Sequence, residues 1–346
     1  MHLRHYPYSN VRGLSGLTMS PLSFRSVGAR LSRFRNTAPL LLAALLALPL
    51  AADAAEQFGN LRFATPGPTI TTLPMQIASE KGMDKEEGFT AAFTNTTGSV
   101  AIKAMLAGDF DLTLSVGGSL TAAVSGAPTK VIYVHVAKPL YFLYAREGVA
   151  NVRALEGLRV GVDAIGGSGE FALRRAMQAG GADANKTTFL AMGFQNTPPS
   201  LIAGAIDAAV LTPPTEFQLT KSGKEFVNLG FLGDYAAGLT GGIGTTDRMI
   251  KERPNALRAV LRAQVKAHRY VLENRAGTIA AISRFLNISA DDAAQSYDST
   301  VLPHYSKTGD IPVAVQQAVV DEQGRMLKLT RTPQVSTLFD FSFIGN

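Results

Sequence analysis

Short apolar runs alternate with longer amphipathic stretches from residue 55 to about residue 250. The runs have the length of strands and the stretches that of crossover helices, which is typical of an α/β protein with a parallel sheet. A first series of expected strands covers residues 61–65, 90–95, 111–116 and 130–136, with helices beginning near Thr72, Gly98 and Gly118. A second series covers residues 158–163, 187–192, 206–211 and 225–229, with helices beginning near Ser168, Pro198 and Pro214.

The two series repeat one plan. The segment LRFA at residues 61–64 returns as LRVG at 158–161, and LAGDFD at 106–111 returns as IAGAID at 202–207. In each copy a helix ends at Ala-Gly, where glycine can adopt the left-handed conformation of a helix C-terminus. An Asp follows shortly afterwards and opens a buried strand. We therefore expect two similar lobes.

The chain becomes helical from Pro254 onward and has no further strand series. Expected helices cover residues 254–274, 277–286, 290–297 and 312–326 and should pack against the first lobe. Two crossovers, at residues 141–145 and 238–244, would join the lobes, and the glycines of the second could absorb backbone changes during closure. The expected division is lobe I, residues 55–143 plus 241–346, and lobe II, residues 144–240. A cleft between two domains is a favoured place for a ligand.

The N-terminal segment has the order of features of a signal peptide. Six arginines precede or border a 15-residue apolar run at 38–52, which is shorter than the roughly 20 residues of a membrane span. Ala52-Asp53-Ala54 then provides the small-x-small pattern of a cleavage site. We expect residues 1–54 to be removed after Ala54 and the mature protein to be periplasmic. An uncleaved anchor is the alternative, and Met19 is an alternative start.

Charge and cysteine content exclude several function classes. Most of the net charge of +6 comes from the N-terminal segment, because the remaining residues hold 27 basic and 26 acidic side chains, a net of +1. A near-neutral body offers no basic face for nucleic acid. The chain has no Cys, which excludes disulfides, thiolate metal sites and a lipidated cysteine.

Motifs of known enzymes are incomplete. GGSGE at residues 166–170 lacks the last glycine of a nucleophile elbow. GSGEFA at 167–172 matches a dinucleotide fingerprint, but no acid follows between Asp183 and Asp207. Three histidines of the mature chain are widely spaced and are expected to be structural or solvated: His135, His268 and His304. We predict no catalytic residue, no metal and no cofactor.

Small polar loops follow four of the expected strands, at residues 69–72, 117–119, 166–169 and 212–215. Parallel sheets bind ligands beyond the carboxyl ends of their strands. Three of the loops run into a helix, whose free N–H groups and dipole favour an anion. Ordinary capping is the alternative, with Ser119 and Ser168 as N-caps.

The candidate ligand-binding residues come from these loops and their neighbours. They are Thr71, Thr72, Gly118, Ser119, Lys138, Gly167, Ser168, Thr212 and Glu216. Lys138 places a cation near the expected cleft, which suits an anionic ligand, although simple surface solvation is the alternative.

Several segments resemble a known family. IASEKGMDKEEGF at residues 77–89 resembles the iAsekGyFkeeGl stretch of solute-binding proteins for sulfonates, taurine and nitrate. LAGDFD at 106–111 is similar to their LaaGeiDf, and LEGLRVGV at 155–162 to their LkGKkVgv. AQVKAHRYVLEN at 263–274 also looks like theirs, and the similarity runs through residues 61–300. The same superfamily includes binding proteins for the thiamine pyrimidine precursor.

The resemblance implies a type 2 periplasmic binding protein fold, in which two α/β lobes enclose a ligand cleft. It implies a monomeric receptor that serves an ABC permease and its ATPase and binds a small organic anion of the sulfonate, taurine, nitrate or carboxylate type. The alternatives are a receptor for a neutral or cationic heterocycle, such as a thiamine pyrimidine precursor, and a sensor partner of a membrane kinase. Related thiamine-pyrimidine synthases carry a Cys-rich motif, which this chain lacks.

Overall fold

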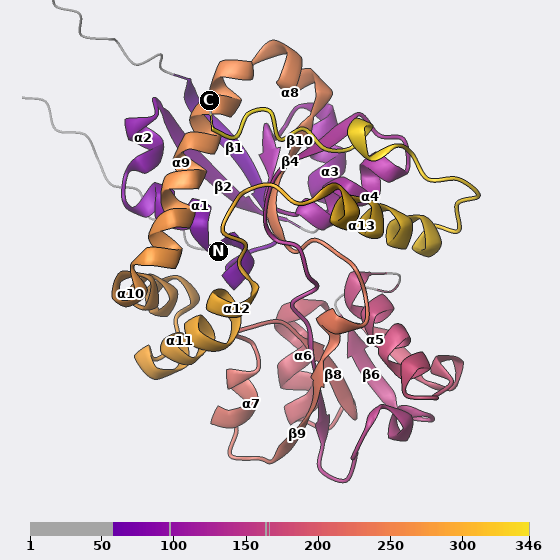
Figure 1. Ribbon diagram of the computed structural model, residues 1–346. Coiled ribbons are helices and arrows are strands. Elements are labelled where there is room, and N and C mark those ends of the chain that lie inside the picture. The colour runs from indigo at the N-terminus through magenta and orange to yellow at the C-terminus, as the bar shows by residue number, and fades with distance from the viewer. Residues whose placement is uncertain (1–57, 97, 163–164, 166, 346) are drawn as a thin grey trace, which may run out of the picture. The chain divides into compact units, whose positions relative to one another are not determined.

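The computed structural model describes residues 58–345, except 97, 163–164 and 166, and all of them belong to one compact unit, Asp53–Asn346 (Figure 1). The expected signal peptide and its cleavage site lie outside the described residues. Among the described helices, none is both long and apolar enough to cross a bilayer.

The first sheet holds five strands in the order β2-β1-β3-β10-β4. They are β1 (Gly59–Thr65), β2 (Phe89–Asn95), β3 (Leu112–Thr113), β4 (Thr129–Val136) and β10 (Gly241–Thr246). β1 pairs in parallel with β2 and β3, whereas β10 runs antiparallel to β3 and β4. Because β1 and β3 are parallel neighbours, the loops that follow them leave from the same edge of the sheet.

The second sheet has the order β7-β6-β8-β5-β9. Its strands are β5 (Phe142–Arg146), β6 (Arg159–Val162), β7 (Thr188–Ala191), β8 (Ala208–Leu211) and β9 (Phe226–Phe231). β6 pairs in parallel with β7 and β8, and β5 runs antiparallel to β8 and β9. This is the plan of the first sheet, with β5 in the place of β10. The antiparallel strands β5 and β10 overlap the two expected crossover segments, residues 141–145 and 238–244.

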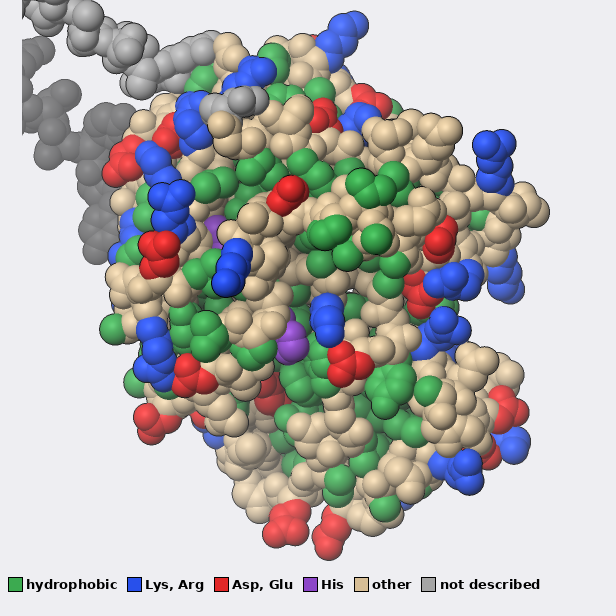
Figure 2. All heavy atoms as spheres, viewed as in Figure 1, with side chains coloured by type: hydrophobic (Ala, Val, Ile, Leu, Met, Phe, Trp, Pro, Cys, Tyr) green, Lys and Arg blue, Asp and Glu red, His purple; other side chains and the backbone are tan. Residues whose placement is uncertain are grey.

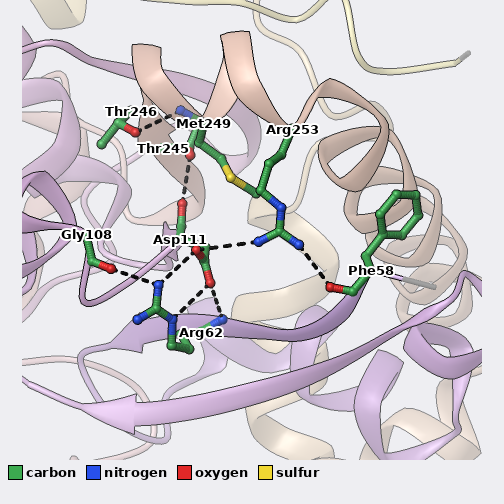
Figure 3. Close-up of polar contacts among 8 residues, drawn as sticks. All are labelled: Phe58, Arg62, Gly108, Asp111, Thr245, Thr246, Met249 and Arg253. Atoms are coloured by element: carbon green, nitrogen blue, oxygen red, sulfur yellow. Dashed lines mark hydrogen bonds and ion pairs between the residues drawn. The ribbon is translucent and has the colours of Figure 1, made fainter. Parts of the chain in front are cut away.

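The internal repeat extends to single hydrogen bonds. Arg62 donates its backbone N–H and its Nε to Asp111 Oδ2, at 2.9 and 3.2 Å (Figure 3). Arg159 donates the same two groups to Asp207 Oδ2, each at 3.0 Å. In the second copy these bonds and Arg146 hold the pKa of Asp207 at about 2. Each pair ties one strand to the start of its parallel neighbour, from the middle of β1 in the first copy and from the first residue of β6 in the second.

The Ala-Gly sequence that ends a helix in each copy also bonds to the arginine of the Arg–Asp pair. Gly108 and Gly204 have φ of 95° and 75°, which confirms the left-handed conformation predicted for both. Their carbonyls accept bonds from Nη2 of Arg62 and Arg159, at 2.8 and 3.1 Å. The repeated sequence therefore encodes one repeated corner.

Helices cover both sheets and form the C-terminal tail (Figure 1). They are α1 (Leu73–Glu80), α2 (Met83–Glu86), α3 (Gly98–Ala107), α4 (Val116–Val124), α5 (Ser168–Ala179), α6 (Gly193–Ile202), α7 (Phe217–Lys221), α8 (Asp247–Glu252), α9 (Pro254–Glu273), α10 (Arg275–Leu286), α11 (Ala290–Ser296), α12 (Leu302–His304) and α13 (Val313–Met326). The apolar stripe of α9, including Leu257 and Val260, packs with β1 and β4 in the largest core cluster. α10 and α11 join that cluster, so the tail packs against the first sheet as expected.

Two helices begin earlier than the sequence predicted. α6 begins at Gly193, and Pro198 and Pro199 lie inside it. Gly193 has φ of 70°, which turns the chain directly after β7. The helix can therefore begin at Gly193, five residues before Pro198, where the sequence predicted its start. α4 begins at Val116 because β3 is only two residues long and ends at Thr113.

Candidate functional site

Each sheet presents two of the candidate loops at one edge. In the first sheet, η1 (Ile70–Thr72) follows β1 and the start of α4 follows β3. In the second sheet, the start of α5 follows β6, and residues 212–216 follow β8. The parallel pairing of β1 with β3 and of β6 with β8 makes the loops of each pair neighbours. These are the edges at which open α/β sheets bind ligands.

The turn η1 holds Thr71 and Thr72 in different roles. The buried Thr72 hydroxyl donates to the carbonyls of Thr69 and Gly67, at 3.0 and 3.3 Å, and so fixes the turn. The Thr71 side chain is half-buried, and its hydroxyl lies 2.9 Å from that of Thr69. Thr71 and Thr69 therefore form a small hydroxyl pair, whereas Thr72 acts on the backbone.

A buried aromatic cluster, formed by Tyr133, His135, His268 and Tyr305, packs against this turn. His135 Nε2 lies 2.9 Å from the Thr71 carbonyl, and the Tyr305 hydroxyl donates to the Ile70 carbonyl at 2.5 Å. The His135 ring packs 4.9 Å from that of Tyr305 and 5.6 Å from that of His268. The position of the turn thus depends on side chains from β4 and from the C-terminal tail.

Both histidines of the cluster are held neutral by their surroundings. Burial, and then the neighbouring His268, lowers the pKa of His135 well below its usual value. Burial lowers the pKa of His268 to about 4, and its Nδ1 lies 2.7 Å from the Tyr133 hydroxyl. A neutral imidazole is the form that a dry interior favours. The sequence predicted that each histidine is structural or solvated, and the structure places both inside the core, where they support the turn η1.

The start of α4 is a packing surface. Ser119 is fully buried, and its hydroxyl has no hydrogen-bond partner among the described residues. A Cβ added at Gly244 of β10 would lie 2.3 Å from that hydroxyl, so Ser119 faces the sheet. A Cβ on Gly117 would lie 2.8 Å from the Leu239 carbonyl, which explains a glycine at that position. The structure thus does not bring Ser119 to the edge, and Gly118 lies one residue before it on the helix.

The start of α5 carries two candidates and an acid. Gly167 is the N-cap residue with an extended backbone, and Ser168 is the first helical residue, so neither serine expected as an N-cap has that role. The Ser168 hydroxyl lies 2.6 Å from that of Tyr141, which precedes β5. Glu170, in the same first turn, is buried and accepts from Arg174 at 2.6 Å. An acid already interacts with the dipole of this helix.

Lys138 does not present an unpaired cation. Its Nζ donates to Asp234 Oδ1 at 3.0 Å, and both side chains are at least half exposed. An exposed ion pair of this kind contributes little to stability.

Thr212 and Glu216 flank the turn after β8. The Thr215 hydroxyl donates to the Thr212 carbonyl at 2.6 Å and shapes that turn. The Thr212 hydroxyl and Glu216 Oε2 are buried, and neither has a hydrogen-bond partner among the described residues. A buried polar group without a partner costs about 1–3 kcal/mol.

The Glu216 carboxyl has an unusual proton affinity. Burial, and then the charge of Asp292 on α11, raises its pKa to about 7. Glu216 as a residue is half-buried, but Oε2 itself is shielded from solvent. Strongly shifted acids of this kind cluster at functional sites. Of the nine candidates, Glu216 carries the clearest electrostatic signal.

Three contacts join the second sheet's helices and loops to the C-terminal tail. Lys221 Nζ of α7 lies 2.8 Å from Asp292 Oδ2, and Arg175 Nε of α5 lies 3.7 Å from Glu322 Oε1 of α13. The Phe231 ring stacks on that of His304 at 4.9 Å. α7 packs on β8, whereas α11 belongs to the core of the first sheet. Glu216 therefore lies where the two lobes meet.

A cavity of about 680 Å³ lies elsewhere, between α9, residues 302–310 and the C-terminal segment. Tyr133, His268 and Tyr305 of the aromatic cluster line it, but no candidate residue does. Among the described residues, no group of three or more metal-ligating side chains could hold a metal ion.

Charge is mixed on the surface. Figure 2 shows basic and acidic side chains interspersed over one face, so this face presents no large area of one sign. This agrees with the near-neutral balance of the chain beyond residue 54.

Two α/β lobes of one plan, joined by two crossover strands, define the type 2 periplasmic binding protein fold, as the sequence predicted. Similar solved structures include the alkanesulfonate-binding protein SsuA from Xanthomonas axonopodis pv. citri bound to MOPS, with TM-score 0.68, 19% identity, and 83% of this chain and 99% of SsuA covered. The nitrate-binding protein NrtA from Synechocystis PCC 6803 matches with TM-score 0.66, 12% identity, and coverage of 82% and 86%.

A third similar structure is the ligand-binding component of an ABC-type import system from Staphylococcus aureus with zinc bound. It matches with TM-score 0.68, 11% identity, and coverage of 82% of this chain and 97% of the other. At these identities the likeness shows the fold alone. The comparison with curated proteins finds no match.

Sequence comparison then gives the family. The family described as NMT1/THI5 like matches residues 70–277, more than half of the 346-residue chain. The protein belongs to the NMT1/THI5-like family, which confirms the resemblance seen in residues 77–89 and 106–111.

Proposed function

We propose that this protein is the exported receptor of an ABC importer, which captures a small molecule between its two lobes and delivers it to a permease with its ATPase. The observation that carries the proposal is the repeated plan, in which the segments after two parallel strands of each sheet leave from its carboxyl edge. Structures of the same fold described as binding proteins, including a component of an ABC-type import system, support it.

The proposed receptor is a periplasmic monomer that performs no turnover and binds no nucleic acid. The His135 and His268 rings are buried in one packing cluster, with nitrogens 2.9 Å from the Thr71 carbonyl and 2.7 Å from the Tyr133 hydroxyl, which supports a structural role for both. Mass spectrometry of small molecules released from the purified protein tests the proposal. Release of a stoichiometric molecule is expected, and an empty protein that no small molecule stabilises would contradict it.

For the ligand we propose a small organic anion whose negative group lies against the start of α5, at Gly167 and Ser168. The helix N-terminus supplies backbone N–H groups and a partial positive charge. A neutral or cationic heterocycle is the second candidate, because the structure adds two buried carboxyls at the edge of the same sheet, Glu170 and Glu216.

The Gly167→Asp variant should fold but lose binding of an anion. Ligand at 100 times its dissociation constant stabilises a protein by about 2.7 kcal/mol, which raises Tm by about 5–11 °C. The new carboxylate repels the anion and fills the space beside the N–H groups, so this shift should disappear. Thermal melts of both proteins with the released molecule measure it.

Asn255→Asp, in the first turn of α9, is the matched control, because it adds the same charge at a helix start that follows no sheet edge. It should keep the full ligand-induced shift. Equal ligand-induced shifts in wild type and Gly167→Asp would show that the loop after β6 is only a helix start.

Export should remove residues 1–54. The apolar run and the Ala52-Asp53-Ala54 pattern predict cleavage after Ala54, so the periplasmic protein should begin at Ala55. Intact mass of protein from the periplasm checks this. A periplasmic product that retains residues 40–50 would contradict a cleaved signal and favour an anchor.

A further inference from the structure

The position of Glu216 combines three properties. It follows the carboxyl end of β8, where the parallel neighbour β6 leads into Gly167 and Ser168. It lies close enough to Asp292 for that charge to act on its carboxyl, and Asp292 belongs to the helix α11 of the other lobe. Oε2 is shielded from water and unpaired. A carboxyl with these properties lies in the region where the lobes would enclose a ligand.

Among the described residues, Oε2 of this carboxyl has no hydrogen-bond partner, although the backbone N–H of Glu216 bonds to the carboxyl. Lys221, on the helix α7 that follows Glu216, pairs with Asp292 at 2.8 Å. Burial, and then the nearby charge of Glu216, raises the pKa of Tyr144 on β5 to about 12, so Tyr144 stays a neutral phenol. Asp292 repels a second negative charge. The charged and titratable groups near the carboxyl are thus the acid Asp292 on α11, the cation Lys221 on α7, which is paired with Asp292, and the phenol Tyr144 on β5.

We propose that Glu216 is the subsite for an N–H donor of the ligand, an ammonium, amidinium or ring amino group, and that the Thr212 hydroxyl bonds to the same end. Such a donor satisfies the buried oxygen that the protein leaves free, and burial strengthens a bond between opposite charges. The inference rests on the proposed receptor function and refines its ligand.

The neighbouring loops then define the two ends of the ligand. β6 and β8 are adjacent strands, about 5 Å apart, so the start of α5 and the turn after β8 can reach one small molecule. An anionic group at Ser168 and an amino group at Glu216 would make the ligand an amino-bearing anion. Nitrate and simple alkanesulfonates lack the second group and should bind weakly.

Matched pairs of probes test the donor directly. Each pair differs by one amino group: taurine and ethanesulfonate, β-alanine and propionate, 4-aminopyrimidine and pyrimidine. Calorimetry and thermal melts at pH 8, where Glu216 is ionised, should show at least about 10-fold tighter binding of the amino member of one pair. In Glu216→Gln that preference should fall to about 2-fold or less.

Glu225→Gln is the control, because this exposed acid lies before β9 in the same lobe and should leave the preference unchanged. Thr212→Val provides a second variant that keeps the carboxyl and should weaken the amino member only. The proposal is overturned if both members of every pair bind equally or if the amine-free members bind more tightly. It is also overturned if none of the six probes stabilises the protein. Release of a small molecule from the same preparation would show that the receptor function survives such a result.

Discussion

Gly242→Ala is expected to be the most damaging of the single changes considered. A Cβ at Gly242 would lie 2.2 Å from the Tyr133 carbonyl oxygen and 3.1 Å from Val116 Cγ2. The first of these atoms is backbone in the paired strand β4 and cannot rotate away. Overpacking of a rigid core costs about 1–3 kcal/mol and sometimes more, and we place this substitution at about 3 kcal/mol or above. At about 2–4 °C per kcal/mol, Tm should fall by at least about 6 °C.

Gly126→Ala is the comparison for that result. Gly126 has φ of 93° and open space around it, so the added methyl costs only backbone strain of about 1–2 kcal/mol. Urea or thermal melts of both variants rank the two losses. A smaller loss in Gly242→Ala than in Gly126→Ala would mean that β10 does not pack this closely on β4.

Wild type should be more stable than His268→Asn at pH 8, and this difference in the free energy of unfolding should decrease as the pH falls. The pKa of His268 is about 4 in the folded protein and about 6.5 when unfolded, so the unfolded chain takes up the proton first. The contribution of neutral His268 is complete above pH 6.5 and is lost as the pH falls from 6.5 towards 4. Between pH 8 and pH 5 this difference should decrease by about 2 kcal/mol, or about 4–8 °C in Tm.

The quantity to measure is the difference in Tm between wild type and His268→Asn. Protonation of Glu216 raises the stability of both proteins as the pH falls, which is opposite to the effect of His268. The pKa of Glu216 is raised in the folded state, so protonation between pH 7 and 4.5 stabilises the fold. Asn keeps a short polar group near the Tyr133 hydroxyl but does not titrate. Melts at pH 8, 6.5 and 5 should show a decreasing difference, and a difference independent of pH would place His268 in contact with water.

The strands could be predicted because buried strands are rich in apolar residues, which can be recognised in the sequence. β1, β4 and β8 each contain a group of buried apolar residues, and each strand lies within two residues of its expected bounds. The tail helix α9 was equally clear, since its apolar stripe has helical spacing. The start of α6 was missed because a glycine with positive φ, Gly193, begins the helix without any capping residue to mark it.

The candidate site could be predicted only as a set of loops. A helix turns about 100° per residue, so the two-residue error in the start of α4 reverses the direction in which Ser119 was expected to point. Lys138 was a cation in the sequence, but its pairing with Asp234 depends on a residue 96 positions away. His135, Tyr305 and Asp292 act on the site through contacts across the fold. The signal available in the sequence was His135, which follows the apolar residues 131–134 of β4.

The placement of β10 has a consequence for the order in which the chain can fold. The strands of the second sheet all lie within residues 142–231, so this sheet can form from one continuous stretch. The first sheet lacks a central strand until residues 241–246 have been made, since β10 sits between β3 and β4. Pairings between distant segments form slowly. The first sheet should therefore complete its strand pairing only late in synthesis, after the second sheet has been able to form.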